Sequence, residues 1–158
     1  MAPRDLGGRR GARYPSGMDK PRLPWAACVA LTLGAAIYGL AVPILELDTT
    51  HLLNPAWPSH ARLHEAWQLA TNSTLAAVAV ASVWRTRRAG RAVAIAAIVT
   101  GGFFVAYLTR DAYGGSMLHT DGTERRVLGV SVGVLGFGLV NVLSVIAVGL
   151  ARRPAPKP

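Results

Sequence analysis

Long apolar runs alternate with short polar stretches along most of the chain. Four runs resemble membrane-spanning helices, each close to the roughly 20 residues that cross a bilayer. Their bounds are about 25–45, 66–84, 92–108 and 127–151. The first run has 21 residues and would reach about 31 Å as a helix, enough to cross the hydrocarbon core. The pattern therefore predicts an all-α protein, an integral membrane four-helix bundle forming one domain over residues 25–151.

The flanking segments and the composition agree with a membrane domain. Residues 1–24 are polar and carry six Lys or Arg, which predicts a disordered basic tail, and residues 152–158 form a second short tail. Hydrophobic residues make up 51% of the 158, and the mean hydropathy is +0.32, too apolar for a soluble domain of this size. Cys28 is the only cysteine, so no internal disulfide or zinc finger can form.

The net charge of +9 follows the pattern of membrane topology. Thirteen Lys or Arg fall in residues 1–24, 85–91 and 152–158, whereas four fall in the loops that alternate with these segments. By the positive-inside rule, this split predicts a multi-pass protein of the cell membrane with both termini in the cytoplasm. Because the charges flank apolar runs, we expect the lipid bilayer as a partner and no nucleic acid.

Residues 54–68 hold the densest polar chemistry of the chain. Two prolines keep the start of this stretch extended, and a helix is predicted to follow. In that helix His60 and His64 are four residues apart and share one face, which Gln68 and Asn72 continue. A polar stripe therefore descends from the outer loop into the second predicted span.

The string Asn54-Pro55-x-Trp57-Pro58-x-His60-Ala61-Arg62-x-His64 resembles a loop of small uncharacterised bacterial four-span membrane proteins. The resemblance covers about fifteen residues together with the four-span layout. It implies a membrane fold and brings no activity with it.

Histidines and carboxylates gather on the predicted outer side. A histidine near a helix N-terminus is discouraged from protonating and can act as a base. A carboxyl group at the lipid edge has its pKa raised by desolvation, which suits a general acid. We therefore expect acid–base catalysis at this outer rim, by residues drawn from several span ends. The catalytic candidates are His60, His64, Glu65, Asp111 and His119.

Further polar residues are candidates for binding a substrate or an ion. Arg62, Gln68, Asn72 and Asp48 are the substrate-binding candidates, although Arg62 could equally extend to the membrane interface and the amides could bond between helices. No cofactor is certain from the sequence. His60 and His64 could hold a divalent metal, and the alternative is a hydrogen-bonded pair of interfacial histidines.

Gly129, Gly133 and Gly136 predict a small-residue stripe in the fourth span, which suits close helix packing or a homo-oligomer. Three functions remain open. The first is an enzyme of isomerase, cyclase or hydrolase type acting on a lipophilic small molecule. The second is a carrier for a small solute or protons, although no mid-membrane charge supports it. The third is a non-catalytic accessory or sensor subunit, so enzymatic activity is not settled by the sequence.

The charge split predicts the orientation directly. A fluorescent protein fused after Pro158 should fluoresce as a cytoplasmic fusion does, and an alkaline phosphatase fusion at the same position should be inactive. Active phosphatase at Pro158 would reverse the orientation and place the histidines in the cytoplasm.

Overall fold

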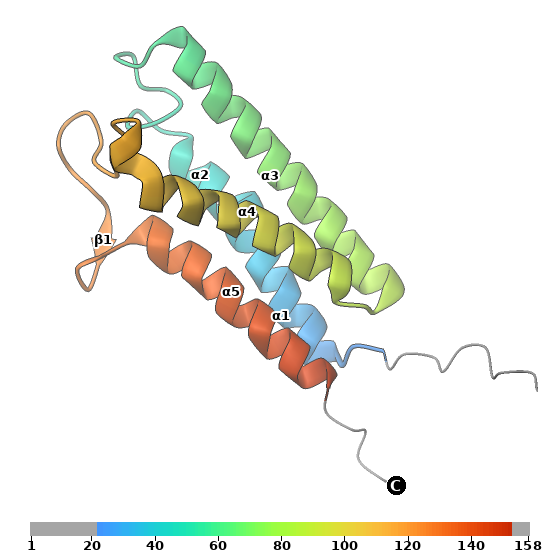
Figure 1. The fold of residues 1–158 in the computed structure, drawn as a ribbon. Helices are drawn as coiled ribbons and strands as arrows, with labels where there is room; N and C mark the ends of the chain where they lie inside the picture. The colour runs from blue at the N-terminus through green and yellow to red at the C-terminus, as the bar shows by residue number, and fades with distance from the viewer. Residues whose placement is uncertain (1–21, 153–158) are drawn as a thin grey trace, which may run out of the picture.

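The computed structural model describes residues 22–152, and the two expected tails, apart from Arg22 to Pro24 and Arg152, lie outside them. Within this range the chain folds as a bundle of four long helical segments, which confirms the predicted all-α architecture (Figure 1). The first segment is divided into α1 (Trp25–Ala36), a π-helical turn η1 (Ile37–Ala41) and α2 (Val42–Glu46). The others are α3 (Ser59–Thr86), α4 (Gly90–Thr109) and α5 (Val132–Ala151).

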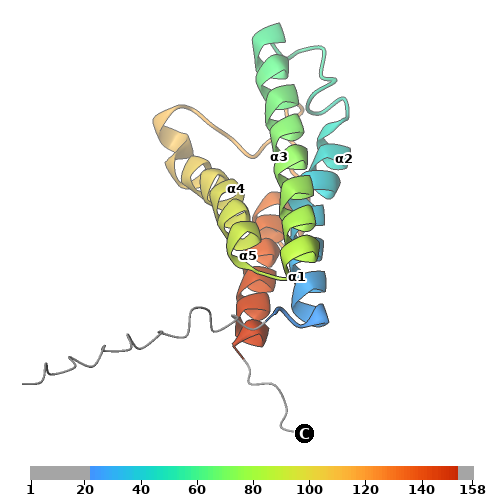
Figure 2. The ribbon, with the colours of Figure 1, turned by 90° about the vertical axis from the view of Figure 1, so that its right-hand side faces the viewer.

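Three of these segments are long and apolar enough to cross a membrane, as judged over the described residues. They are Trp25–Glu46, Gly90–Ala112 and Val132–Ala151. The helix α3 has 28 residues, about 42 Å at the usual rise, but it carries the polar stripe and is less apolar. Figures 1 and 2 show that the first turns of α3 project beyond the ends of the other helices, and that α4 leans away from α3 towards the same end.

A proline divides the first helix. Pro43 has no backbone N–H, so the carbonyl of Gly39 loses the donor that a regular helix would supply four residues later. The backbone widens into the π turn Ile37–Ala41 just before this point. The hydroxyl of Ser73 in α3 donates to the Gly39 carbonyl at 2.9 Å and replaces the missing bond. A side chain of α3 therefore compensates for the break in the neighbouring helix, as serines do in membrane helices.

At the same place two helices pack very closely. A Cβ added to Gly39 would lie 2.1 Å from the Cβ of Ala76 and 3.5 Å from the carbonyl oxygen of Asn72. Only a glycine in the first segment lets α3 come so near. Below this contact the core consists largely of alanine and other small side chains, including Ala27, Ala79 and Ala147.

Polar side chains join the helices, but not in the expected pairs. Asn141 of α5 lies 3.2 Å from the Thr100 hydroxyl of α4, and the indole of Trp84 donates to Thr32 at 3.0 Å. Gln68 and Asn72, whose amides the sequence suggested for bonds between helices, take no part in these pairs.

The start of the last helix corrects two expectations. Residues 126–131 form a short antiparallel hairpin, β1 (Arg126–Val127) and β2 (Val130–Ser131), so the fourth helix begins at Val132 rather than near 127. Gly129 lies in the turn with φ +80°, which glycine adopts without strain. The expected helical stripe through Gly129 is therefore wrong. Gly133 and Gly136 face Phe103 and Ile37 inside the chain, so they no longer argue for a second copy.

The Gly39–Ala76 contact predicts a sharp steric effect. Gly39→Ala should destabilise the protein by about 1–3 kcal/mol, because the new methyl group has no space against α3. The measurement is a melting curve in detergent. Gly101→Ala is the matched control, since an added Cβ meets nothing within 4 Å there. Adding Ala76→Gly to Gly39→Ala should restore part of the loss, and a wild-type melting temperature for Gly39→Ala alone would contradict the packing.

Candidate functional site

Two loops close the end of the bundle at which α3 begins, and they are fastened to each other. Residues 47–58 connect α2 to α3, and residues 110–125, which begin with the 3-10 turn η2 (Arg110–Ala112), connect α4 to the hairpin. Asn54 is 3% exposed, and its amide donates to the Thr120 hydroxyl at 3.0 Å, while its oxygen accepts from the Ala56 N–H. We call these segments the outer loops. Their connection fixes the side chains that they place over the helices.

A cavity of about 420 Å³ lies beneath the outer loops. Its wall within the bundle is mostly apolar, and its other end is polar. The apolar lining comprises Ile37, Ala41, Val42, Leu45, Leu69, Phe103, Met117, Val132, Phe137 and Leu139. The polar end comprises Glu46, His51, Glu65, Gln68, His119, Glu124, Arg125 and Ser131. Such a cavity suits an elongated molecule with one polar end.

His51 is at the centre of the polar end, between two carboxylates. Its Nε2 lies 2.8 Å from Oε2 of Glu46, and its Nδ1 lies 2.8 Å from the Thr50 hydroxyl oxygen. Thr50 in turn lies 2.6 Å from Oδ1 of Asp48. Hydrogen bonds from Thr50 hold the pKa of Asp48 well below its ordinary range, so this carboxylate is ionised and only accepts. The single hydroxyl proton of Thr50 is therefore donated to Asp48.

The direction of the Thr50 hydrogen bond determines the tautomer of His51. Because the Thr50 proton points to Asp48, the Thr50 oxygen accepts, and Nδ1 of His51 carries the donated proton. Burial lowers the pKa of His51 despite its hydrogen bond to Asp48, which favours the neutral imidazole. Nε2 then faces Glu46 with a lone pair at hydrogen-bonding distance, and one proton must lie between the two groups. Glu46 and His51 thus form an acid–base pair that shares a proton.

Arginines pair with two carboxylates of the outer loops. Arg125 bonds to Asp48 and to the carbonyl oxygen of Leu45, at 3.3 Å for the latter. Arg126 pairs with Glu124 at 2.6 Å. These contacts join the hairpin side of the cavity to the end of α2. They also place Asp48 and Glu124 in ion pairs, leaving other groups to act on a ligand.

Three groups at the polar end have no partner among residues 22–152. No hydrogen bond or salt bridge reaches the side chains of Glu65 and Gln68, and Nε2 of His119 is buried without a partner. The His119 ring packs edge-on against His51, with centroids 4.7 Å apart. Burial raises the pKa of Glu65 above its ordinary value. These groups are the ones that a bound polar group could satisfy.

The structure brings together part of the predicted site. Glu65, Gln68 and His119 line the cavity, and Asp48 orients His51 from just behind it. Asp111 is 91% exposed beside Arg110 and lies away from the cavity. Asn72 is buried one turn further down, at the contact between η1 and α3, and Arg62 does not line the cavity either.

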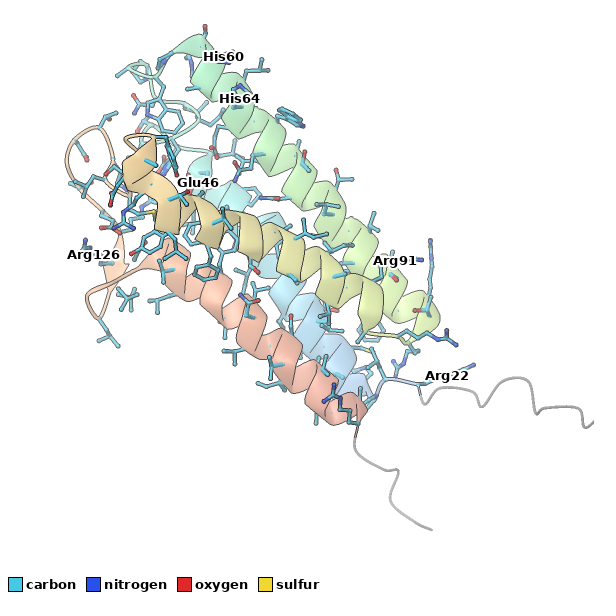
Figure 3. All side chains as sticks on the ribbon, in the orientation of Figure 1. Arg22, Glu46, His60, His64, Arg91 and Arg126 are labelled. Atoms are coloured by element: carbon cyan, nitrogen blue, oxygen red, sulfur yellow. The ribbon has the colours of Figure 1, made fainter. Side chains whose placement is uncertain are left out.

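His60 and His64 also lie elsewhere. Both are on the projecting turns of α3, whereas Glu46 lies between the helices (Figure 3). Their Nε2 atoms are 3.0 Å apart in a solvent-exposed pair. The part of the chain that the structure describes brings no group of three metal-ligating side chains together, so this pair has two ligands to offer.

Sequence reasoning left Glu46, His51, Glu124 and Arg125 out of the proposed site. Helical periodicity could find His64 and Gln68, but it says nothing about a loop that folds back over a helix end. The available signal was the placement of Glu46 at the end of an apolar run, five residues before a histidine.

A model of a family of unknown function, DUF6640, matches residues 30–153. The chain belongs to this family. The match takes in most of α1 and all of the later helices and both outer loops, so the cavity lies within the DUF6640 region. No curated protein and no solved structure matches the chain. The chemistry of this DUF6640 member must therefore be argued from its own residues.

Glu65 predicts how stability depends on pH. A carboxyl group with a raised pKa in the folded state stabilises the fold below its ordinary pKa, and this contribution is lost as pH rises through the raised value. The melting temperature of the wild type should therefore fall over that range. Glu65→Gln should flatten the fall, because the amide cannot ionise. An unchanged pH profile in Glu65→Gln would contradict the burial of this carboxyl group.

Proposed function

We propose that the chain is an integral membrane enzyme that moves protons on a lipophilic substrate. The observation that carries this proposal is the Glu46–His51 pair, held by Thr50 and Asp48 at the polar end of an otherwise apolar cavity. A pair that shares one proton can accept or donate a proton at little cost in free energy. Isomerase, cyclase and hydrolase reactions all need such a transfer.

The shape of the cavity supports a lipid-derived substrate. Its apolar wall is formed by the first helix, α3 and α5, and Phe103 of α4 closes one side. The helices α3 and α4 diverge towards the end of the bundle that holds this cavity (Figure 2). The polar end of the substrate would meet His51 and Glu65, while its hydrocarbon body would replace solvent along the apolar wall.

The two acid–base groups have distinct roles. Glu46 takes a proton from the substrate at its second oxygen while the shared proton moves from Glu46 to Nε2 of His51, which is neutral beforehand. Glu65, whose pKa is raised by burial, donates a proton at a second position. In an isomerisation the proton lost at one atom is balanced by the proton gained at another, so no oxidant or reductant is required. Gln68 and His119 would hold the polar end of the substrate.

The proposal includes a membrane topology. We infer four spans, with α3 as the second, and both termini in the cytoplasm, because the arginine-rich ends of the helices lie opposite the outer loops. The cavity then faces the extracytoplasmic side. A carrier is a weaker alternative, because the half of the bundle below Gly39 is filled by small buried side chains.

The experiment detects proton transfer and does not require the substrate to be identified beforehand. Protein in nanodiscs is incubated in deuterium oxide with a total lipid extract of the organism that carries the gene. Mass spectrometry then searches the extract for deuterium incorporated at carbon, or for mass changes of hydrolysis. Wild-type protein should label one lipid class, and His51→Ala and Glu46→Gln should slow the labelling by roughly 10²–10⁴-fold, the usual share of a general acid or base.

The controls separate the cavity from the exposed histidines. His60→Ala and His64→Ala should label as fast as wild type, because neither side chain lines the cavity. Melting curves confirm that each variant is folded. Two results would overturn the proposed enzymatic activity and leave the carrier or accessory role. One is labelling that survives His51→Ala and Glu46→Gln, and the other is wild-type labelling no greater than that of a protein-free sample.

A further inference from the structure

A second cavity, of about 680 Å³, lies at the opposite end of the bundle. It is enclosed by the turn between α3 and α4, by Leu23 before α1 and by Ala151 at the end of α5. Three arginines line it: Arg87 and Arg88 of that turn, and Arg91 in the first turn of α4. Figure 3 shows Arg91 at the end away from His60 and His64.

The positive charge of this cavity is not compensated within the described chain. The six carboxylates of residues 22–152 lie at the outer end, in segments 46–65 and 111–124. No salt bridge reaches the three cavity arginines in this range. Arg91 donates one hydrogen bond, to Ser82 at 3.4 Å, and the Arg87 guanidinium lies 5.8 Å from the ring centre of Trp84. Since each guanidinium has five N–H donors, most of them are open to an anion.

We propose that this cavity binds the phosphate of an anionic phospholipid. Guanidinium groups bind phosphate through paired, charge-assisted hydrogen bonds, and basic pockets between membrane helices take such headgroups. A groove that could take an acyl chain lies between α4 and α5 at the same end of the bundle. It has a volume of about 350 Å³, reaches Arg152, and is lined by Val93, Ala97, Val145 and Val148 and by the polar Asn141 and Ser144.

The backbone conformation of Arg87 allows its side chain to be removed without a loss of stability. Arg87 ends α3 in the left-handed conformation, with φ +53°, at a position where glycine is the common residue. Its carbonyl accepts a bond from the Leu23 N–H at 2.8 Å, which any residue could provide. Replacement by glycine therefore removes the side chain and also relieves the backbone strain of the left-handed conformation. A loss of lipid binding in this variant can then be told apart from a loss of folding.

The experiment is native mass spectrometry of the full-length protein released from detergent, titrated with phosphatidylglycerol or phosphatidylcholine. Wild type should retain phosphatidylglycerol in preference to phosphatidylcholine. Arg87→Gly should melt no lower than wild type and still lose affinity several-fold. The double variant Arg87→Gln with Arg91→Gln should lose roughly tenfold or more, as expected when two guanidinium contacts to an anionic lipid are removed.

Arg85 provides the matched control. It belongs to the same basic segment but does not line the cavity, so Arg85→Gln should bind phosphatidylglycerol as wild type does. Equal losses in Arg85→Gln and in the double variant would show a general surface charge and overturn the site. Equal binding of the two lipids would overturn it as well. Displacement of phosphatidylglycerol by an equal concentration of inorganic phosphate would assign the cavity to a free anion instead.

Discussion

Pro43 cannot donate a backbone hydrogen bond, and the outer half of the molecule is arranged around that missing donor. The first helix widens into a π turn, the Gly39 carbonyl accepts from Ser73, and Gly39 lets α3 approach to the contact with Ala76. Because this contact holds α3 against the broken helix, the short α2 that follows is directed under the outer loops. Glu46, at its end, thereby reaches His51.

The two ends of the bundle differ in chemistry for a common reason. A lipid-crossing core accepts few polar groups, so the titratable residues are displaced to the ends. At the outer end, carboxylates, histidines and Arg125 form a connected network above an apolar cavity. At the other end, arginines surround a cavity without carboxylates from the described residues. The small side chains packed between them keep the two cavities apart.

The sequence predicted the helices better than the site, and the difference is physical. Apolar runs of helical length place α1, α4 and α5 within a few residues, because the cost of exposing backbone in lipid dominates there. Pairs at spacing four, such as His60 and His64, were also found, and they do face each other. The partners of His51 were not found, since Glu46 and Asp48 meet it through a loop whose path depends on the Asn54–Thr120 bond. Gly129 was read as helical because helical spacing cannot recognise a hairpin turn that starts just before an apolar run.

The proposed chemistry depends on one proton shared between Glu46 and His51 at the polar end of the cavity. The most direct measurement is nitrogen-15 NMR of protein labelled at histidine, in membranes at neutral pH, with His51 assigned from a His51→Gln variant. If the proton is shared, the ring of His51 should be neutral and protonated at Nδ1, and its Nε2 signal should report a strong hydrogen bond and shift in Glu46→Gln. A His51 ring that exchanges between tautomers like a free surface imidazole, and does not respond to Glu46→Gln, would contradict it.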